Sequence, residues 1–166
     1  ESGVSDAMSG TQSVVSEAVS DVSSVGEASK EEYSEEEYSD VDISEYVENI
    51  ADYEFFHYGE EGNGYYSISG YHGTDPYIIL PTEYNGEPVT GIGHQDNYIF
   101  SFNTYIKGVI IPACYTGGEW GIFTGCTSLE SVVFLGEKFE FGLYTFSSCT
   151  GMKNLVLPEK QETLPR

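Results

Sequence analysis

The sequence is short of positive charge, of cysteine and of long apolar runs. Its 166 residues hold 6 Lys and Arg against 28 Asp and Glu, a formal net charge of −22. A surface this acidic repels phosphate backbones and anionic lipid headgroups, so we expect neither nucleic acid nor a membrane surface as a partner. No run reaches the roughly 18 apolar residues of a membrane-spanning helix, so we expect no direct membrane insertion. Three cysteines without a Cys-x-x-Cys pair give no zinc framework.

Motifs for catalysis are missing as well. No glycine-rich phosphate loop follows an expected strand, and there is no Gly-x-Ser-x-Gly. The three histidines, His57, His72 and His94, stand in separate segments without metal-ligand spacing, which favours ordinary turn or strand-edge roles. We therefore expect a protein that is not an enzyme, with no catalytic residue, no metal and no cofactor.

Acidic residues are concentrated in the first third of the chain. Residues 1–60 contain 17 Asp and Glu and one Lys, whereas residues 61–166 contain 11 acidic and five basic residues. Residues 1–40 include eleven Ser and no Phe, Trp, Leu or Ile, so they have little to bury against the entropy of ordering. We predict a disordered Ser/Glu-rich tether over residues 1–42. The alternative is a short amphipathic helix that uses the helical spacing of Val15, Ala18, Val19 and Val22.

The start of the chain bears on location. The sequence begins at Glu1 rather than Met and shows no leader peptide, which indicates a removed leader or a trimmed chain. An acidic tether before a folded domain is typical of secreted or wall-anchored bacterial proteins. A lipid anchor on a cysteine upstream of Glu1 is compatible with this arrangement, which makes the chain a lipoprotein candidate.

The folded domain is predicted over residues 43–166, and its first part, 43–76, reads as a capping hairpin. Aromatic-rich runs at 53–58 and 65–71 flank a glycine-rich break, which is the pattern of two strands and a turn. A short helix is expected before them, at about 44–51, with Ile43, Val47 and Ile50 on one face.

The remaining residues, 77–166, repeat with a period of 23. Such a period predicts a β-rich solenoid in which a short strand of each unit pairs in parallel with the next, about 4.8 Å away. A first unit at 78–81 matches 109–112 at an offset of 31, so eight extra residues should lie within 83–88 and 94–98. Five columns carry the period: Phe100, Phe123 and Phe146; Asn103, Cys126 and Cys149; Ile106, Leu129 and Met152; Val109, Val132 and Leu155; Ile111, Phe134 and Leu157.

Residues 109–112, 122–129 and 145–149 resemble the BspA-type leucine-rich repeat, whose unit reads approximately L-x-x-I-x-I-P-x-x-V-x-x-I-G-x-x-A-F-x-x-C. The resemblance covers about residues 63–166. It implies a curved solenoid on secreted or surface proteins, mainly of host-associated bacteria, that binds or adheres without catalytic residues. The middle unit departs from the pattern, because Gly118-Glu119 stands in place of Ile-Gly.

The cysteine column raises the question of a disulfide. Cys126 and Cys149 should lie about 5 Å apart on neighbouring rungs, within reach of a bridge. Their side chains should run parallel into the core, which opposes the dihedral angle that a bridge needs. We favour two buried thiols, and we expect Cys114, in a loop, to be the exposed cysteine.

Two surface features are candidate binding sites. If Val109 and Ile111 point inward, alternation turns Ile110 outward. The equivalent residues Ile79, Val133 and Val156 should then complete an exposed apolar stripe, which is either a contact surface or a simple consequence of strand propensity. Trp120, beside Glu119, either stacks on a sugar or packs over its own solenoid. The partner-binding candidates are therefore Ile79, Ile110, Val133, Val156 and Trp120.

These features favour a non-enzymatic extracellular or cell-surface protein-binding module, acting in adhesion or partner recognition. Its partner would be another protein or a second copy, held at the sheet face. A structural spacer that displays a neighbouring domain is the first alternative, and a carbohydrate-binding module is the second. The last repeat is incomplete, because Leu164 begins a rung whose Phe would fall beyond Arg166. We therefore expect the chain to be cut from a longer array.

Overall fold

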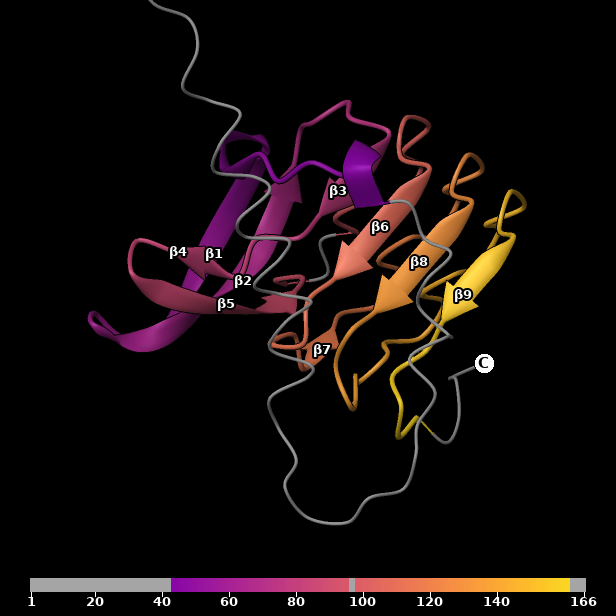
Figure 1. The fold of residues 1–166 in the computed structure, drawn as a ribbon. Coiled ribbons are helices and arrows are strands. Elements are labelled where there is room, and N and C mark those ends of the chain that lie inside the picture. The colour runs from indigo at the N-terminus through magenta and orange to yellow at the C-terminus, as the bar shows by residue number, and fades with distance from the viewer. Residues whose placement is uncertain (1–42, 96–97, 162–166) are drawn as a thin grey trace, which may run out of the picture. The chain divides into compact units, whose positions relative to one another are not determined.

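A computed structural model describes residues 43–95 and 98–161. The tether predicted at 1–42 and the unfinished unit that includes Leu164 lie outside the described residues. The chain divides into two units, Glu1–Glu45 and Tyr46–Arg166. In the first unit the described structure is a single 3-10 turn, η2 (Ile43–Glu45). The second unit is a β-solenoid of about four turns (Figure 1).

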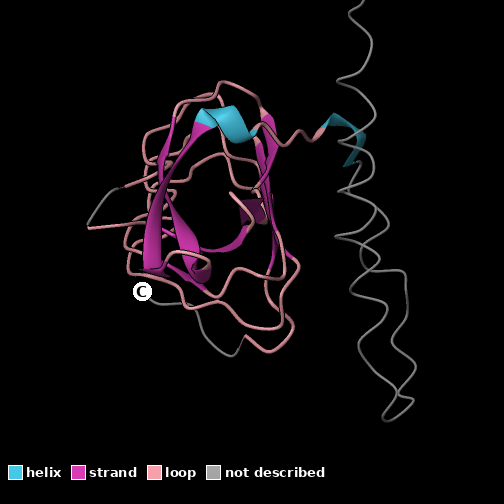
Figure 2. Cartoon of the chain, turned by 90° about the vertical axis from the view of Figure 1, so that its left-hand side faces the viewer, coloured by secondary structure: helices cyan, strands magenta, loops and turns pink. Residues whose placement is uncertain are grey.

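Two sheets form the walls of the solenoid, and Figure 2 shows strands on opposite sides of the section, joined by loops. The first, which we call the repeat sheet, has the order β3-β6-β8-β9. The second, the hairpin sheet, has the order β1-β2-β5-β4, and β7 also pairs with β5. The bounds are β1 Tyr53–Glu60, β2 Asn63–Tyr71, β3 Tyr77–Ile79, β4 Glu83–Tyr84, β5 Glu87–Ile92, β6 Gly108–Ile111, β7 Gly117–Gly118, β8 Ser131–Phe134 and β9 Asn154–Val156.

The repeat sheet confirms the predicted period. Its strands are parallel and in register, so that Ile78 pairs with Val109, Val109 with Val132, and Val132 with Leu155. Each pairing of neighbouring full repeats advances by 23 residues. The short strands suffice because every rung buries its apolar residues against the rungs above and below rather than within itself.

The predicted hairpin is also confirmed, since β1 and β2 pair antiparallel from Glu60 and Asn63 at the turn to Tyr53 and Tyr71 at the far end. β2 then pairs in parallel with β5, so the hairpin closes the N-terminal end of its sheet. Part of the eight-residue excess is the β4–β5 turn, in which Asn85 (φ 52°) and Gly86 (φ 81°) are left-handed.

The prediction of a helix at 44–51 is wrong. Val47 forms a parallel bridge with Ile78, donating its N–H to Tyr77 O at 3.0 Å and accepting from Ile79 N–H at 2.9 Å. These bonds hold the backbone extended at the point where a helix would need it coiled. A second 3-10 turn, η3 (Ile50–Asp52), follows before β1 begins.

The interior is built around the phenylalanine column. The rings of Phe100 and Phe123 stack with centroids 5.3 Å apart, and those of Phe123 and Phe146 follow at 5.7 Å with an interplanar angle of 5°. The ring centroid of Tyr71, in the hairpin, lies 5.1 Å from that of Phe100, so Tyr71 extends the column of rings into the hairpin. Phe123 is fully buried.

Cys126 and Cys149 are free thiols, as predicted, and Cys126 is buried, but Cys149 is half-buried rather than buried. Cys126 Sγ donates to Phe100 O at 2.9 Å, and Cys149 Sγ donates to Phe123 O at 3.0 Å. Burial raises the pKa of Cys126 to about 12. Cys114 is half-buried rather than exposed: it packs against the interior cluster, and Val89 O of β5 lies 3.4 Å from its Sγ.

Candidate interaction surfaces

The outer face of the repeat sheet carries the four aliphatic residues predicted to form an exposed stripe. Ile79, Ile110 and Val133 are absent from the interior cluster that contains Val109 and Val132, which agrees with the predicted alternation. The predicted exposure is wrong, however, because the three side chains are only 3%, 5% and 4% exposed. Val156, at the last rung, is half-buried.

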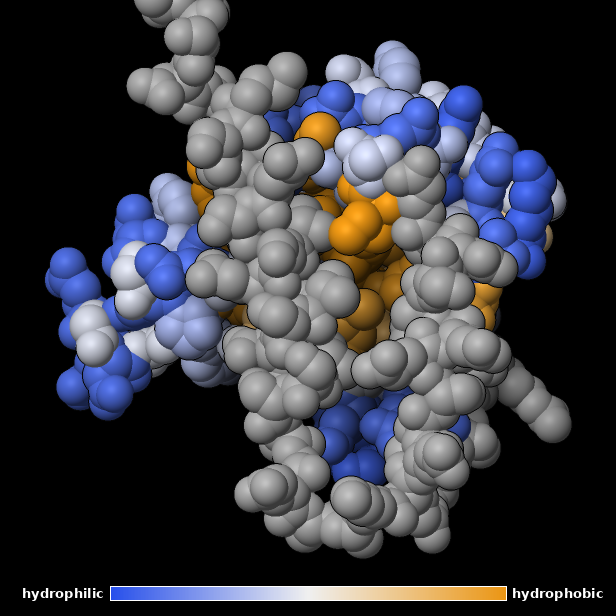
Figure 3. Space-filling view, in the orientation of Figure 1, coloured by the Kyte–Doolittle hydropathy of each residue, from blue (hydrophilic) through white to orange (hydrophobic). Residues whose placement is uncertain are grey.

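Two packing effects help to explain this burial. Parallel register puts the three side chains in one row at the inter-strand spacing of about 4.8 Å, so neighbours in the row contact one another. At the start of the row, the space over Gly108 is filled by the Tyr46 hydroxyl and the Tyr77 ring, and the two tyrosine rings lie 5.3 Å apart. The alternation of side chains along a strand determines on which side of the sheet a residue lies, but not how much of its side chain is exposed to solvent. Figure 3 shows hydrophobic residues gathered over β6 and β8 on this side.

The second surface lies on the turns that join the hairpin sheet back to the repeat sheet. These turns stack rung on rung through backbone bonds such as Phe100 N–H to Ile122 O and Phe123 N–H to Thr145 O. Large apolar side chains project from them into solvent, and we call them the loop face: Tyr98 (57% exposed), Phe102 (73%), Trp120 (54%), Leu143 (40%) and Tyr144 (60%).

Two of these aromatics sit on left-handed backbone, with φ of 59° at Phe102 and 61° at Tyr144. One rung away, the equivalent positions are Gly125 and Gly121, also left-handed. A side chain at such a φ costs about 1–2 kcal/mol, which Gly avoids. The repeat therefore tolerates glycine at these positions, and the aromatic residues are not needed for the turn. Neither Phe102 nor Tyr144 was predicted from the sequence as a candidate binding residue. The sequence pattern that could have identified them is an aromatic residue in a repeat column where a neighbouring unit has Gly.

Trp120 is the one predicted candidate that is exposed. Its side chain is 54% exposed, and it is among the residues that line an open groove of about 580 Å³ on the hairpin-sheet side. Tyr58 and Tyr65 line another part of this groove, and Gly91 and Gly117 lie along its floor.

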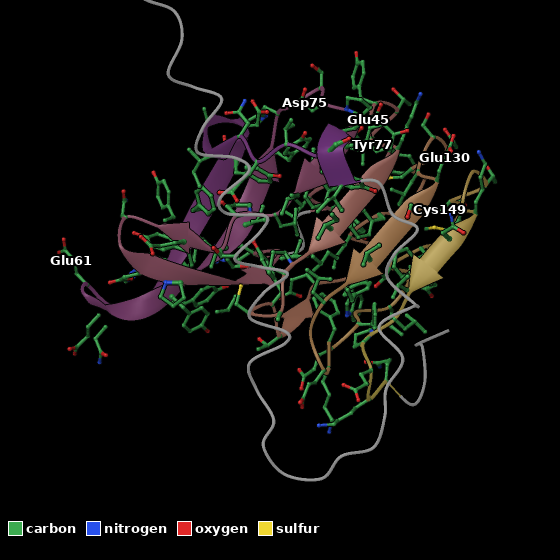
Figure 4. The ribbon with its side chains drawn as sticks, in the orientation of Figure 1. Glu45, Glu61, Asp75, Tyr77, Glu130 and Cys149 are labelled. Atoms are coloured by element: carbon green, nitrogen blue, oxygen red, sulfur yellow. The ribbon has the colours of Figure 1, made fainter. Side chains whose placement is uncertain are left out.

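Charged side chains form ladders along the rungs. Lys153 Nζ lies 2.7 Å from Glu130 Oε2, and Lys160 Nζ lies 2.7 Å from Glu137 Oε2, each across one 23-residue step. The Lys153 hydrogen bond and charge lower the pKa of Glu130, and Lys107, one rung on the other side, lowers it further. Figure 4 shows Glu130 at the end of the repeat sheet where its strands begin. These pairs are exposed and neutralise part of the acidic surface.

A tighter pair holds the hairpin to the inserted turn. His57 Nε2 lies 2.5 Å from Glu87 Oε2, and the Gly62 N–H donates to the other oxygen of Glu87. Desolvation raises the pKa of Glu87, but the bonds from His57 and Gly62 outweigh it and the pKa is lowered overall.

Within residues 43–95 and 98–161, no group of three or more His, Cys, Asp or Glu side chains is placed to hold a metal ion. Over the same residues, no helix is long and apolar enough to cross a membrane.

The stacked parallel rungs, the interior aromatic column and the 23-residue period define a leucine-rich-repeat solenoid. Residues 89–166 match the family model described as BspA type Leucine rich repeat region (6 copies). This part of the chain is a BspA-type leucine-rich repeat region, as its sequence motifs predicted.

Among solved structures, a leucine rich cell surface protein from Faecalibacterium prausnitzii A2-165 has the same fold, with a TM-score of 0.54 and 23% sequence identity. The match covers 64% of this chain and 29% of that one, so the chain spans less than a third of the structure that it matches. No curated protein matches the sequence.

Proposed function

We propose that this chain is a non-enzymatic recognition module that binds a protein partner through its loop face. The observation that carries the proposal is the pair of exposed aromatics, Phe102 and Tyr144, held at left-handed positions where a neighbouring rung has Gly. Such residues add strain and exposed apolar area without serving the core. Aromatic side chains grouped on a rigid surface are typical of the centres of protein–protein interfaces.

The rung geometry supports this role. Tyr98 lies over Gly121, and Phe102 lies over Gly125, so close that a Cβ added to these glycines would meet the rings at 2.6 and 2.5 Å respectively. The rings are therefore supported from below by the next rung. A partner that docks on them meets a preformed surface and loses less entropy than one that must order a loop.

An extracellular or cell-surface location is part of the proposal. It is supported by the BspA-type repeat region and by the likeness of the fold to a bacterial cell surface protein. Adhesion through a protein of the surroundings is the finer form of this function. The spacer alternative differs in requiring no contact at the loop face.

The test replaces each exposed aromatic with the residue of the neighbouring rung, giving Phe102→Gly with Tyr144→Gly. Binding of the chain to a panel of immobilised extracellular-matrix proteins is measured by biolayer interferometry, with Tyr65→Ala, in the groove, as the matched control. We expect the double variant to lose binding by at least about tenfold while the control retains it. A chain that binds none of the panel, or a double variant that binds like the parent, would favour the spacer.

A further inference from the structure

We propose that the groove between Tyr65 and Trp120 is a binding site for a neutral oligosaccharide. This site is separate from the loop-face contact proposed above, although Trp120 borders both. Its lining combines aromatic rings with exposed polar groups, which is the mixture that pyranose rings require: apolar faces that stack on an aromatic plane, and hydroxyls that hydrogen-bond at the edges.

The groove follows the rungs of the hairpin sheet. Ser67 pairs with Gly91, Gly91 with Gly117, and Gly117 with Glu140, so its floor crosses four successive rungs. Three inter-strand steps span about 14 Å. The floor therefore suits an extended chain of sugar units better than a single one. Gly91 and Gly117 add no side chain of their own to this floor, and the side chains of Ser67 and Glu140 lie against them.

The platform at one end is rigid. The Tyr65 ring, 44% exposed, stacks on Tyr58 with centroids 5.2 Å apart and an interplanar angle of 13°. The Tyr58 hydroxyl lies 3.0 Å from His94 Nδ1, and the His94 ring stacks on Phe56 at 3.5 Å. Because each ring is held by the next, Tyr65 presents its free face without first ordering a side chain.

The hydrogen-bonding groups are also positioned by packing. The stem of Glu119 lies against Gly93, so closely that a Cβ added to this glycine would clash with it. The Cβ of Glu140 lies 3.1 Å from the position that a Cβ would take on Gly117. Both side chains are exposed and line the groove, so their carboxylates can accept hydrogen bonds from sugar hydroxyls.

Charge and ring geometry select the class of ligand. The charged side chains among the described residues that line the groove are Glu119 and Glu140, both acidic, so uronic, sialic and sulfated sugars are repelled. The same two carboxylates and the faces of the aromatic rings also attract cations, so a cationic probe is the alternative that the test must separate. Tyr58 and Tyr65 are parallel and stacked on each other, and this flat platform suits the apolar face of a pyranose ring.

The chain has a single tryptophan, so the groove carries its own reporter. Tryptophan emission is titrated with triacetylchitotriose, cellotetraose and maltotetraose, and with trigalacturonate and tetralysine as anionic and cationic probes. We expect at least one neutral probe to give a saturable change that the charged probes do not give. No saturable change with any neutral probe, or binding of tetralysine instead, overturns the proposal.

Variants that keep Trp120 locate the site. Tyr65→Ala should weaken binding of the neutral probe by about tenfold or more, whereas Tyr65→Phe should retain it because the stacking plane remains. Tyr144→Gly, on the loop face, should bind like the parent, which separates this site from the proposed protein contact. Equal losses in Tyr65→Ala and Tyr144→Gly contradict the assignment. If the melting temperature shows that Tyr65→Ala is unfolded, Glu119→Ala with Glu140→Ala takes its place, with the same expected loss.

Discussion

Phe100 and Phe102 are two residues apart on one turn, but the first is buried and the second is exposed. Phe100 is 1% exposed and stacks on Phe123 in the interior column, whereas Phe102 is 73% exposed and lies on the outside. In the next units, the position of Phe100 is again Phe, but the position of Phe102 becomes Gly125 and then Ser148. The solenoid thus repeats the residue on which its stability depends and varies the exposed one, and the variable position is the one that we propose for recognition.

The largest effect should come from breaking the interior column. Phe123→Ala removes a ring that is stacked on both sides, so we expect a loss of about 3–5 kcal/mol in the free energy of unfolding. Urea denaturation followed by circular dichroism measures it. A loss below about 1 kcal/mol would mean that the column does not support the core.

A second prediction contrasts buried and accessible positions within one column of thiols. Because burial raises the pKa of Cys126 to about 12, almost no thiolate forms at pH 8, and we expect no reaction with iodoacetamide in the folded chain. Cys149, which is less buried, should react slowly. Mass spectrometry of peptides after labelling distinguishes the two, and urea should make all three cysteines react. Equal labelling of Cys126 and Cys149 under folding conditions would contradict the burial.

The third prediction concerns the pair that joins the hairpin to the inserted turn. The pKa of Glu87 is lowered from its ordinary value of 4.5 in the folded chain, so its contribution is present above that value and is lost as the pH falls through the folded pKa. We expect Glu87→Gln to lower the melting temperature at pH 6, and to lower it by progressively less as the pH falls below 4.5 and through the folded pKa. A difference from the parent that does not shrink at low pH would exclude this ionisation as the cause.

The smallest effect on stability is expected at the loop face. In Phe102→Gly, relief of left-handed strain offsets the larger conformational freedom of unfolded Gly, so stability should change by less than about 1 kcal/mol. The same denaturation experiment as for Phe123→Ala makes the two results comparable. A loss as large as that of the interior variant would show that Phe102 serves the fold, and would remove the main support for the proposed protein contact.

Several features of the fold could be predicted from the spacing and type of residues alone. The 23-residue spacing of Phe100, Phe123 and Phe146 predicted both the solenoid and the stacked rings, because a period in sequence becomes a column in space once the rungs stack in register. The thiol state of Cys126 and Cys149 followed from the same columns. The hairpin was visible in its aromatic strands and glycine-rich break.

Other features were decided by contacts between distant segments. The segment around Val47 has the apolar spacing of a short helix, yet hydrogen bonds to β3 hold it extended. Ile110 leaves the sheet on the outer side, as alternation requires, yet it is buried by packing that no alternation rule contains.

The sequence by itself determined the repeat, the interior column and the family, because these depend on which residues recur and on what spacing. Only the tertiary structure decided which side chains are accessible and which distant groups meet. Trp120 and Tyr65 are 55 residues apart and share a groove because the rungs of the hairpin sheet stack Ser67, Gly91, Gly117 and Glu140 in one row. The exposure of a side chain and its distance from residues remote in sequence depend on the packed chain, because backbone pairing over long sequence distances sets the position of every side chain.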